Sequence, residues 1–158
     1  MEGNKHKHLK KVAIGWLANK IKCTIFAEEL EIYPKDPDAY GIKSNDDCYY
    51  IECKATQEDL MGGLQRKFNK NLFELKMTKH RFIADFFYFV LADGLDIKDK
   101  YPHWGIINEH GEVVRRAKRI PRCDEQQNYP YLDQNPEKLR KQIGSVCCRR
   151  LYRDLIIF

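Results

Sequence analysis

The segment "DPDAYGIKSNDDCYYIECKAT", residues 36–56, decides the fold of this chain. Two runs of strand-forming residues flank the polar turn SNDD, and this pattern predicts a β-hairpin. The second run, "CYYIECKA", contains Glu52 and Lys54. Side chains alternate along a strand, so these two charged residues share a face with Tyr50, whereas the opposite face can enter the core. Their presence indicates either a charged edge of a sheet or a functional site.

The sequence on both sides of this hairpin predicts helices packed against a central sheet. Apolar residues at helical spacing predict an amphipathic helix over about residues 6–22, and Thr56 begins a helical region that extends to about residue 82. A last helix is predicted from Asn135, its N-cap. Further strands are predicted at residues 23–33, 84–92, 103–108 and 112–116. The order α-β-β-β-α-β, followed by a hairpin and a helix, predicts an α/β layered fold.

The composition predicts one globular domain. The chain has 158 residues, of which 43% are apolar and 32% charged, and it contains no repeat or linker. The longest apolar run, Phe86–Ala92, is too short to span a bilayer, and no apolar secretory signal follows the basic N-terminus. We therefore expect a cytoplasmic protein without membrane association. Its core is expected over about residues 6–118, followed by a basic extension and a helix over about 119–158.

The positive charge is concentrated in the C-terminal part of the chain. From Val113 onward 11 Lys and Arg residues stand against 5 Asp and Glu, whereas the first 112 residues carry 17 against 18, and the net charge is +5. Basic flanks around an acidic centre suit a polyanion held against a metal site. A solvated surface explains the same counts equally well, so charge alone does not select a function.

Two carboxylates on neighbouring predicted strands indicate a site for Mg²⁺ or Mn²⁺. Across the hairpin, Asp38 can lie beside Glu52, and carboxylates with backbone carbonyls are hard oxygen ligands. A lysine beside them, here Lys54, can orient a water or stabilise developing negative charge. The pattern acid-x-Lys occurs three times, but only at Glu52 does it lie on a predicted strand, 14 residues after a Pro-Asp turn. The six cysteines include no C-x-x-C pair, so no zinc site is predicted.

These motifs carry a resemblance to a known family. "PDAYGI" and "YYIECKAT", with the α-β-β-β-α-β order, resemble the PD-(D/E)xK nuclease superfamily. The longer pattern, with "IECKATQEDL", a helix containing Lys67 and "ADFFYFVLA" before "WGII", is similar to small single-domain bacterial DNA-repair members and covers about residues 9–107. The resemblance implies a restriction-endonuclease-like core, with a central mixed sheet flanked by helices and an added C-terminal helix. It also implies a Mg²⁺- or Mn²⁺-dependent deoxyribonuclease.

The resemblance assigns roles to four positions of the motif. Asp38 and Glu52 would be the metal-binding carboxylates, and the backbone carbonyl of Cys53 would be a further metal ligand. Lys54 would be the catalytic lysine. Asp38, Glu52 and Lys54 thus form the implied catalytic set.

The motif does not specify which residues complete the site. Many members add an acid from the first helix or the strand after it. Here the predicted first helix has no acid, so Glu28 or Glu29 is the substitute, with Glu29 favoured because it is nearer the turn. Some members use a polar residue from the helix after the lysine, for which Gln65 and Lys67 are candidates. A solvent-facing position is the alternative for each of these four residues.

A nucleic-acid-binding surface is predicted near the last hairpin. The run "RRAKRIPR", residues 115–122, could follow phosphates, although a solvated basic run is an equal alternative. Trp104 near a strand start could stack on a base, with a half-buried structural aromatic as the alternative. His6 and His8 are interpreted as surface residues. The candidate nucleic-acid-binding residues are Arg115, Arg116, Lys118, Arg119 and Trp104.

Three functions remain open from the sequence. The first is a Mg²⁺-dependent deoxyribonuclease acting in repair, recombination, restriction or mobile-element defence. The second is a nuclease fold that binds nucleic acid without cutting it, which the absence of an acid on the first helix favours. The third is an adaptor, which would show neither metal binding nor salt-dependent affinity for DNA. We favour the first, with DNA as the partner. RNA as a substrate, a homodimer and the preferred DNA structure are left open.

Overall fold

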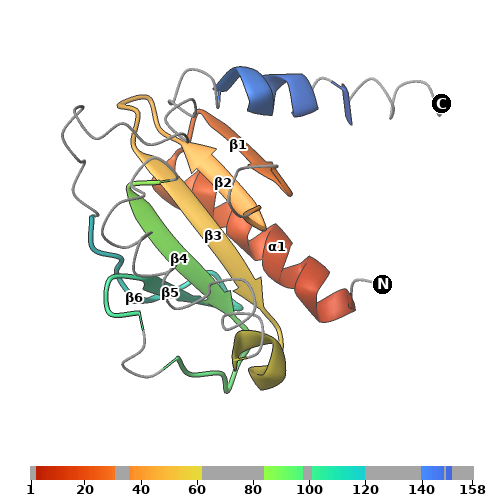
Figure 1. The fold of residues 1–158 in the computed structure, drawn as a ribbon, viewed down its shortest axis with the longest axis vertical. Helices are drawn as coiled ribbons and strands as arrows, with labels where there is room; N and C mark the ends of the chain where they lie inside the picture. Colours follow the sequence, from red (N-terminus) through yellow and green to blue (C-terminus); the bar gives the residue numbers. More distant parts are fainter. Residues whose placement is uncertain are drawn as a thin grey trace, which may run out of the picture.

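A computed structural model of the chain describes residues 3–30, 36–61, 84–97, 101–119, 140–147 and 149–150. At its centre lies a six-stranded mixed sheet in the order β1-β2-β3-β4-β5-β6, with helices beside it (Figure 1). The predicted α/β fold, a mixed sheet flanked by helices, is confirmed at this level. The elements are α1 (Asn4–Trp16), η1 (Leu17–Ile21), β1 (Ile25–Glu28), β2 (Ala39–Ile42), β3 (Cys48–Lys54), β4 (Phe86–Leu91), β5 (Gly105–Asn108) and β6 (Val113–Arg115), with further helical segments at 57–61 and 140–147.

The predicted hairpin is formed by β2 and β3. These strands pair antiparallel, with Tyr40 opposite Tyr50, and β1 pairs antiparallel with the other side of β2. On its second side β3 pairs parallel with β4, so it lies between two strands. All seven residues of β3 are buried. The alternative of a charged edge strand is therefore wrong, because Glu52 and Lys54 lie in the interior of the sheet.

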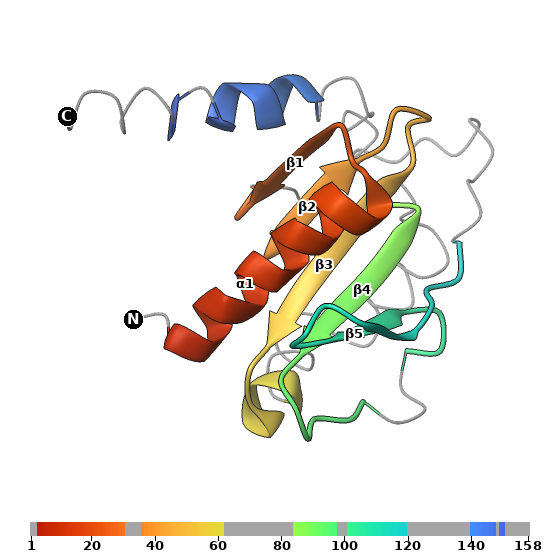
Figure 2. The same cartoon turned by 180° about the vertical axis from the view of Figure 1, so that it is seen from behind.

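One face of the sheet is covered by α1, as Figure 2 shows. The helix buries Leu9, Ala13 and Trp16 against the uncharged face of β3. After Trp16 the chain continues as one π-helical turn, η1, and stops at Lys22, whose φ of 60° is left-handed. The helix predicted over about residues 6–22 is confirmed.

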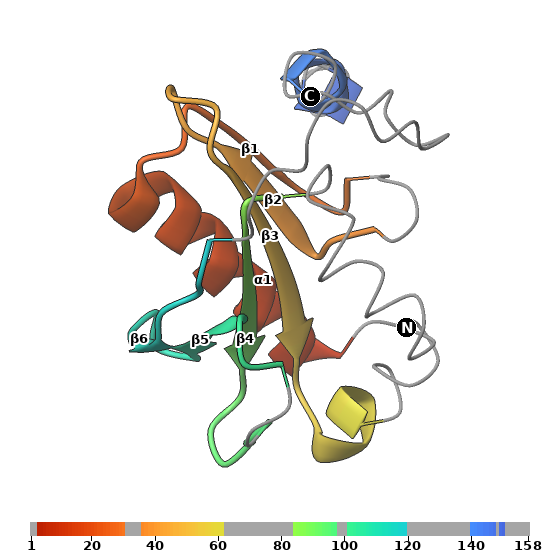
Figure 3. The ribbon, with the colours of Figure 1, turned by 60° about the vertical axis from the view of Figure 1, so that its left-hand side comes forward.

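Aromatic side chains fill the opposite face of the sheet. The ring of Trp104 stacks on Phe89 with centroids 4.2 Å apart and lies 5.1 Å from Phe87. Ile143 from the C-terminal helix joins the same core and is fully buried. In Figure 3 the sheet is seen closer to edge-on, with α1 on one side of it. The predicted last helix is confirmed over the described residues, and its predicted cap, Asn135, lies outside them.

Two arginines, one in the helical segment 140–147 and one at residue 150, connect the C-terminal part of the chain to the β1–β2–β3 meander. Arg140 forms an ion pair with Asp46 in the hairpin turn. Arg150 donates a hydrogen bond to the backbone carbonyl of Glu28, at 3.0 Å. This part of the chain thus connects the hairpin turn to the outer strand of the sheet. None of the helices in the described part of the chain is long and apolar enough to cross a membrane.

Two predicted elements have different bounds in the structure. The strand predicted over 23–33 ends at Glu28, because Glu29 turns the backbone with a left-handed φ of 51°. The helical region predicted from Thr56 begins as expected, since the hydroxyl of Thr56 accepts a hydrogen bond from the Asp59 amide at 3.1 Å. Helix is described there over residues 57–61, and the remainder of that prediction lies outside the described residues.

Gly105 is expected to be required by the close packing of β5. A Cβ atom at this position would lie 2.1 Å from the Tyr88 ring and 2.7 Å from the backbone nitrogen of Ala117. Gly105→Ala should therefore lower the free energy of unfolding by about 1–3 kcal/mol, measured by urea denaturation. Gly15→Ala in α1 is the control, since nothing lies within 4 Å of its added Cβ. Gly15→Ala should leave the free energy of unfolding unchanged or raise it by up to about 1 kcal/mol. Equal losses of stability in Gly105→Ala and Gly15→Ala would contradict a steric clash at Gly105.

Candidate metal and catalytic site

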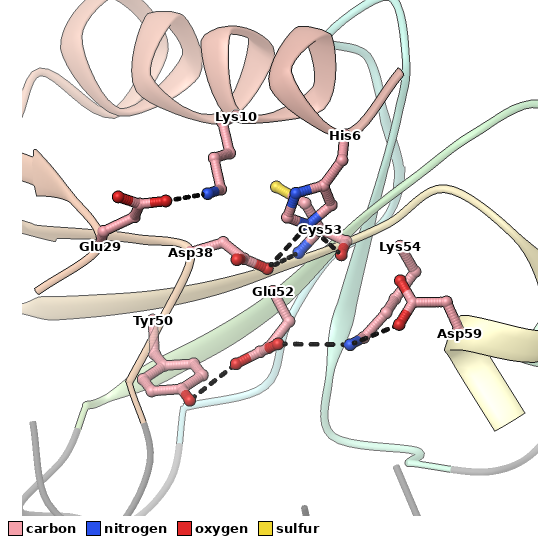
Figure 4. Close-up of polar contacts among 9 residues, drawn as sticks. All are labelled: His6, Lys10, Glu29, Asp38, Tyr50, Glu52, Cys53, Lys54 and Asp59. Carbon is pink, nitrogen blue, oxygen red and sulfur yellow. Dashed lines mark hydrogen bonds and ion pairs between the residues drawn. The ribbon is translucent and has the colours of Figure 1, made fainter. Parts of the chain in front are cut away.

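The structure brings the three predicted catalytic residues to adjacent ends of β2 and β3 (Figure 4). Asp38 directly precedes β2, and its amide donates to the backbone carbonyl of Ile51 at 3.0 Å. Its carboxylate Oδ2 accepts a hydrogen bond from the amide of Cys53 at 2.7 Å. The side chain of Asp38 is therefore fixed at the end of β3, where Glu52 and Lys54 are located.

The carboxyl of Asp38 is held in its ionised form. Burial acts to raise the pKa of this carboxyl, but the hydrogen bonds from His6 and the Cys53 amide and the positive charge of Lys54 outweigh burial. The net result is a pKa below the ordinary value of 3.8. A carboxylate that stays charged at neutral pH is available as a metal ligand.

Glu52 and Lys54 form a buried ion pair. Their side chains are 1% and 3% exposed, and Lys54 Nζ lies 3.6 Å from Glu52 Oε2. The other carboxylate oxygen of Glu52 accepts a hydrogen bond from the hydroxyl of Tyr50 at 2.9 Å. Burial, followed by the charge of Glu52, raises the pKa of Tyr50 well above its usual range, so this hydroxyl remains a donor. Buried charges persist only with such compensation, which makes this strand end a built polar site.

His6 on α1 also belongs to this site, although it is not among the predicted site residues. His6 Nε2 lies 3.2 Å from the Cys53 carbonyl oxygen and 3.6 Å from Asp38 Oδ2. The interpretation of His6 as a surface residue is therefore wrong. A signal was present in the sequence, because His6 stands three and seven residues before Leu9 and Ala13 on the apolar stripe of α1. A polar side chain on that stripe faces the sheet.

Glu29, the favoured substitute for a helix acid, has a different partner. Its carboxylate accepts a hydrogen bond from Lys10 Nζ at 2.5 Å, and the Lys10 side chain is only 7% exposed. The side chain of Glu28 is exposed at the end of β1. The structure thus joins Glu29 to α1 through Lys10, and brings neither acid into contact with Lys54 among the described interactions. The candidates Gln65 and Lys67 lie outside the described residues.

An open pocket of about 470 Å³ gives access to the site. It lies between the first turn of α1 and the start of the helix at 57–61. Both positive and negative groups line it, so it can accept a phosphate beside carboxylates. The lining residues are Gly3, Lys5, His6, Asp38, Lys54, Ala55, Thr56 and Asp59.

A second acidic cluster follows β4 and β5. The ligand atoms of Asp93, Glu109 and His110 all lie within 4.8 Å of one another, and no other group of three such side chains does so in the described part of the chain. Asp93 and His110 are exposed, and Glu109 forms an ion pair with Lys5. This cluster is a competing location for a cation, and no local motif predicts it because its residues come from two separate turns.

The stacking prediction for Trp104 is wrong. Its side chain is 2% exposed and lies among the rings of Phe87, Phe89 and Tyr101, so no face of the indole is open to a base. The half-buried position that was the alternative is also exceeded, because the indole is buried against β4 and the segment before β5.

The four basic candidates differ in their surroundings. Arg115 donates hydrogen bonds to the Tyr101 and Trp104 carbonyls, both at 2.9 Å. Arg119 donates to Asp47 at 2.7 Å, although its side chain is 48% exposed. Both arginines therefore have structural contacts. Arg116 and Lys118 are exposed, which leaves them as the basic candidates best placed to reach a phosphate.

Comparison with known proteins informs the fold and leaves the function open. No family model matches the sequence, and no curated protein is similar to it. The solved structure of a protein of unknown function from Silicibacter pomeroyi is similar, with a TM-score of 0.64 and 15% sequence identity. The similarity covers 96% of this chain and 91% of that chain. This chain therefore shares its fold with another protein over almost its whole length, and its function must be inferred from the site.

Proposed function

We propose that this protein is a metal-dependent nuclease that hydrolyses DNA phosphodiester bonds. The carrying observation is that Glu52 and Lys54 form a buried ion pair at the end of β3, and that Asp38, fixed by the Cys53 amide, lines the same pocket as Lys54. The proposal includes a restriction-endonuclease-like core, which the order from α1 to β3 and the parallel pairing of β3 with β4 support.

Carboxylates together with a backbone carbonyl are the ligand type that a divalent cation such as Mg²⁺ or Mn²⁺ prefers. The pKa of Asp38 is lowered, and the carboxylate of Glu52 is paired with Lys54 in the interior. Asp38, Glu52 and the Cys53 carbonyl would hold the cation, and His6 Nε2 is close to two of these groups. A bound divalent cation would supply Lewis acidity toward the phosphate and lower the pKa of a water.

The chain's own residues have defined tasks in this scheme. Lys54 carries a positive charge that can stabilise the negative charge developing on the phosphate, and it lines the pocket. Tyr50 holds the carboxylate of Glu52 in one orientation through its hydroxyl. The Cys53 amide does the same for Asp38. These contacts preorganise the set, which is what such a reaction requires.

A nucleic-acid-binding protein without cleavage is the second candidate. It is favoured by one observation, that α1 presents His6 and Lys10 toward this region and no carboxylate. Cleavage separates the two candidates. A panel of labelled duplex, nicked, flapped, branched and single-stranded DNA should be cut by the wild type when Mg²⁺ or Mn²⁺ is added. Binding without cutting by any cation would favour the second candidate.

The location of the cation is tested by a matched pair of variants. A cation at 100 times its Kd should stabilise the wild type by about 2.7 kcal/mol, measured by thermal unfolding. Asp38→Asn should weaken cation affinity at least about tenfold, by calorimetric titration. Asp93→Asn, in the exposed cluster, is the control and should leave both quantities unchanged. If Asp93→Asn weakens cation affinity and Asp38→Asn does not, the cation binds at Asp93, Glu109 and His110, and the proposed site is wrong.

A further inference from the structure

We propose that Asp59 is a positioning residue for Lys54, holding its ammonium group toward the pocket during phosphodiester cleavage. This role rests on the proposed nuclease function. Lys54 Nζ lies between two carboxylates, 3.6 Å from Glu52 Oε2 and 3.8 Å from Asp59 Oδ1. The side chain of Glu52 is 1% exposed, whereas that of Asp59 is 44% exposed and lines the pocket. Lys54 is thus attached on one side to the sheet and on the other to the pocket wall (Figure 4).

The backbone at Asp59 is anchored by hydrogen bonds and by a buried neighbour. Its amide donates to the hydroxyl of Thr56 at 3.1 Å, which caps the helix that begins at residue 57. The next amide, that of Leu60, donates to the Thr56 carbonyl at 3.0 Å. The Leu60 side chain is 1% exposed and belongs to the core. A carboxylate mounted on an anchored helical turn can fix the direction of a lysine, which a carboxylate on a mobile loop cannot do.

The two carboxylates around Lys54 are not equivalent once a cation binds. Glu52 would then share its charge with the cation, so its attraction for Lys54 would weaken. Asp59 is outside the proposed ligand set and keeps its attraction. It would therefore become the main group that holds the ammonium in place. This division of tasks explains why a lysine that already has a buried partner also has a second one at the surface.

A role of Asp59 in repelling the substrate predicts a different kinetic change from a role in positioning Lys54. A carboxylate in the wall of a pocket that receives a phosphodiester repels it, so a purely repulsive Asp59 would raise KM in the wild type. A positioning Asp59 acts on Lys54 and supports kcat. The two effects predict different changes when the charge is removed by Asp59→Asn.

The kinetic experiment compares Asp59→Asn with Glu58→Gln. Glu58 is an exposed acid in the same helical turn and is not among the described ion-pair partners of Lys54, so the control removes the same charge one residue away. We expect Asp59→Asn to lower kcat about 10- to 100-fold, with KM and cation affinity within about twofold of the wild type. Glu58→Gln should retain wild-type values. An unchanged or raised kcat with a lowered KM in Asp59→Asn would overturn the positioning role.

A second measurement does not depend on activity. The ammonium signal of Lys54 in nitrogen-15 NMR spectra can be assigned by its disappearance in Lys54→Met. We expect this signal to shift or broaden in Asp59→Asn and to stay unchanged in Glu58→Gln. If the wild type cuts no DNA with any cation, the proposed nuclease function fails, while the NMR result still decides whether Asp59 holds Lys54. An unchanged Lys54 signal in Asp59→Asn would overturn the inference even in an active enzyme.

Discussion

Lys54→Met is expected to lower kcat for DNA cleavage by about 10²- to 10³-fold, the loss typical of removing one group that stabilises transition-state charge. Lys54 lines the pocket, and its ammonium group pairs with the buried carboxylate of Glu52. Methionine has a similar length and keeps the apolar stem, so the change removes mainly the charge. Steady-state kinetics on the preferred DNA substrate, at saturating Mg²⁺ or Mn²⁺, measures the loss.

Lys10→Met is the matched control for this variant. Lys10 is also a buried lysine with an acidic partner, Glu29, but it does not line the pocket. The kcat of Lys10→Met should stay within about threefold of the wild-type value. Circular dichroism of each variant establishes that the fold is retained, because removing Lys54 leaves the charge of Glu52 in the interior. A folded Lys54→Met protein with kcat within tenfold of the wild type would remove Lys54 from the mechanism.

Trp104→Ala is expected to lower the free energy of unfolding by about 3–5 kcal/mol. The indole is 2% exposed and contacts rings from β4 and from the segment before β5, so its loss opens a cavity where two parts of the core meet. Urea denaturation measures the change. Val114→Ala is the control, because that side chain is 65% exposed, and it should change stability by less than about 0.5 kcal/mol.

Trp104→Ala also tests whether the indole contributes to binding of DNA. Because the Trp104 ring is not available to a base, Trp104→Ala should retain wild-type affinity for DNA under conditions where it is folded. A small stability loss together with a large loss of DNA affinity would show that the indole is used at the surface after all.

The turn residues and the alternation of side chains were sufficient to predict the β2–β3 hairpin and which side chains of β3 share a face. Alternation along β3 placed Tyr50, Glu52 and Lys54 on one side, and the structure joins these three by a hydrogen bond and an ion pair. Alternation says nothing about what lies beside a strand. The parallel pairing of β3 with β4 is set by tertiary structure, and it was this pairing that turned a candidate edge strand into an interior one.

Residues distant in sequence account for the parts of the site that were missed. His6 reaches the Cys53 carbonyl across 47 positions, and no local spacing rule connects them. Its place on the apolar stripe of α1 was visible, but a histidine there is compatible with several partners. Glu29 was chosen for its nearness to a turn, and its left-handed backbone then directed its carboxylate to Lys10. The left-handed backbone at Glu29, which local sequence did not predict, therefore accompanies its pairing with Lys10.

The C-terminal helix has a consequence for self-association. β1 is an outermost strand, and every second carbonyl along it points away from β2. Two of these outward carbonyls, at Phe26 and Glu28, accept contacts from Cys147 and Arg150 of the C-terminal segment. A row of unsatisfied carbonyls is a template on which another chain can add a strand and begin to aggregate. Side chains from the C-terminal segment contact two of these carbonyls here, so the segment that contributes Ile143 to the core also covers part of the open edge of β1.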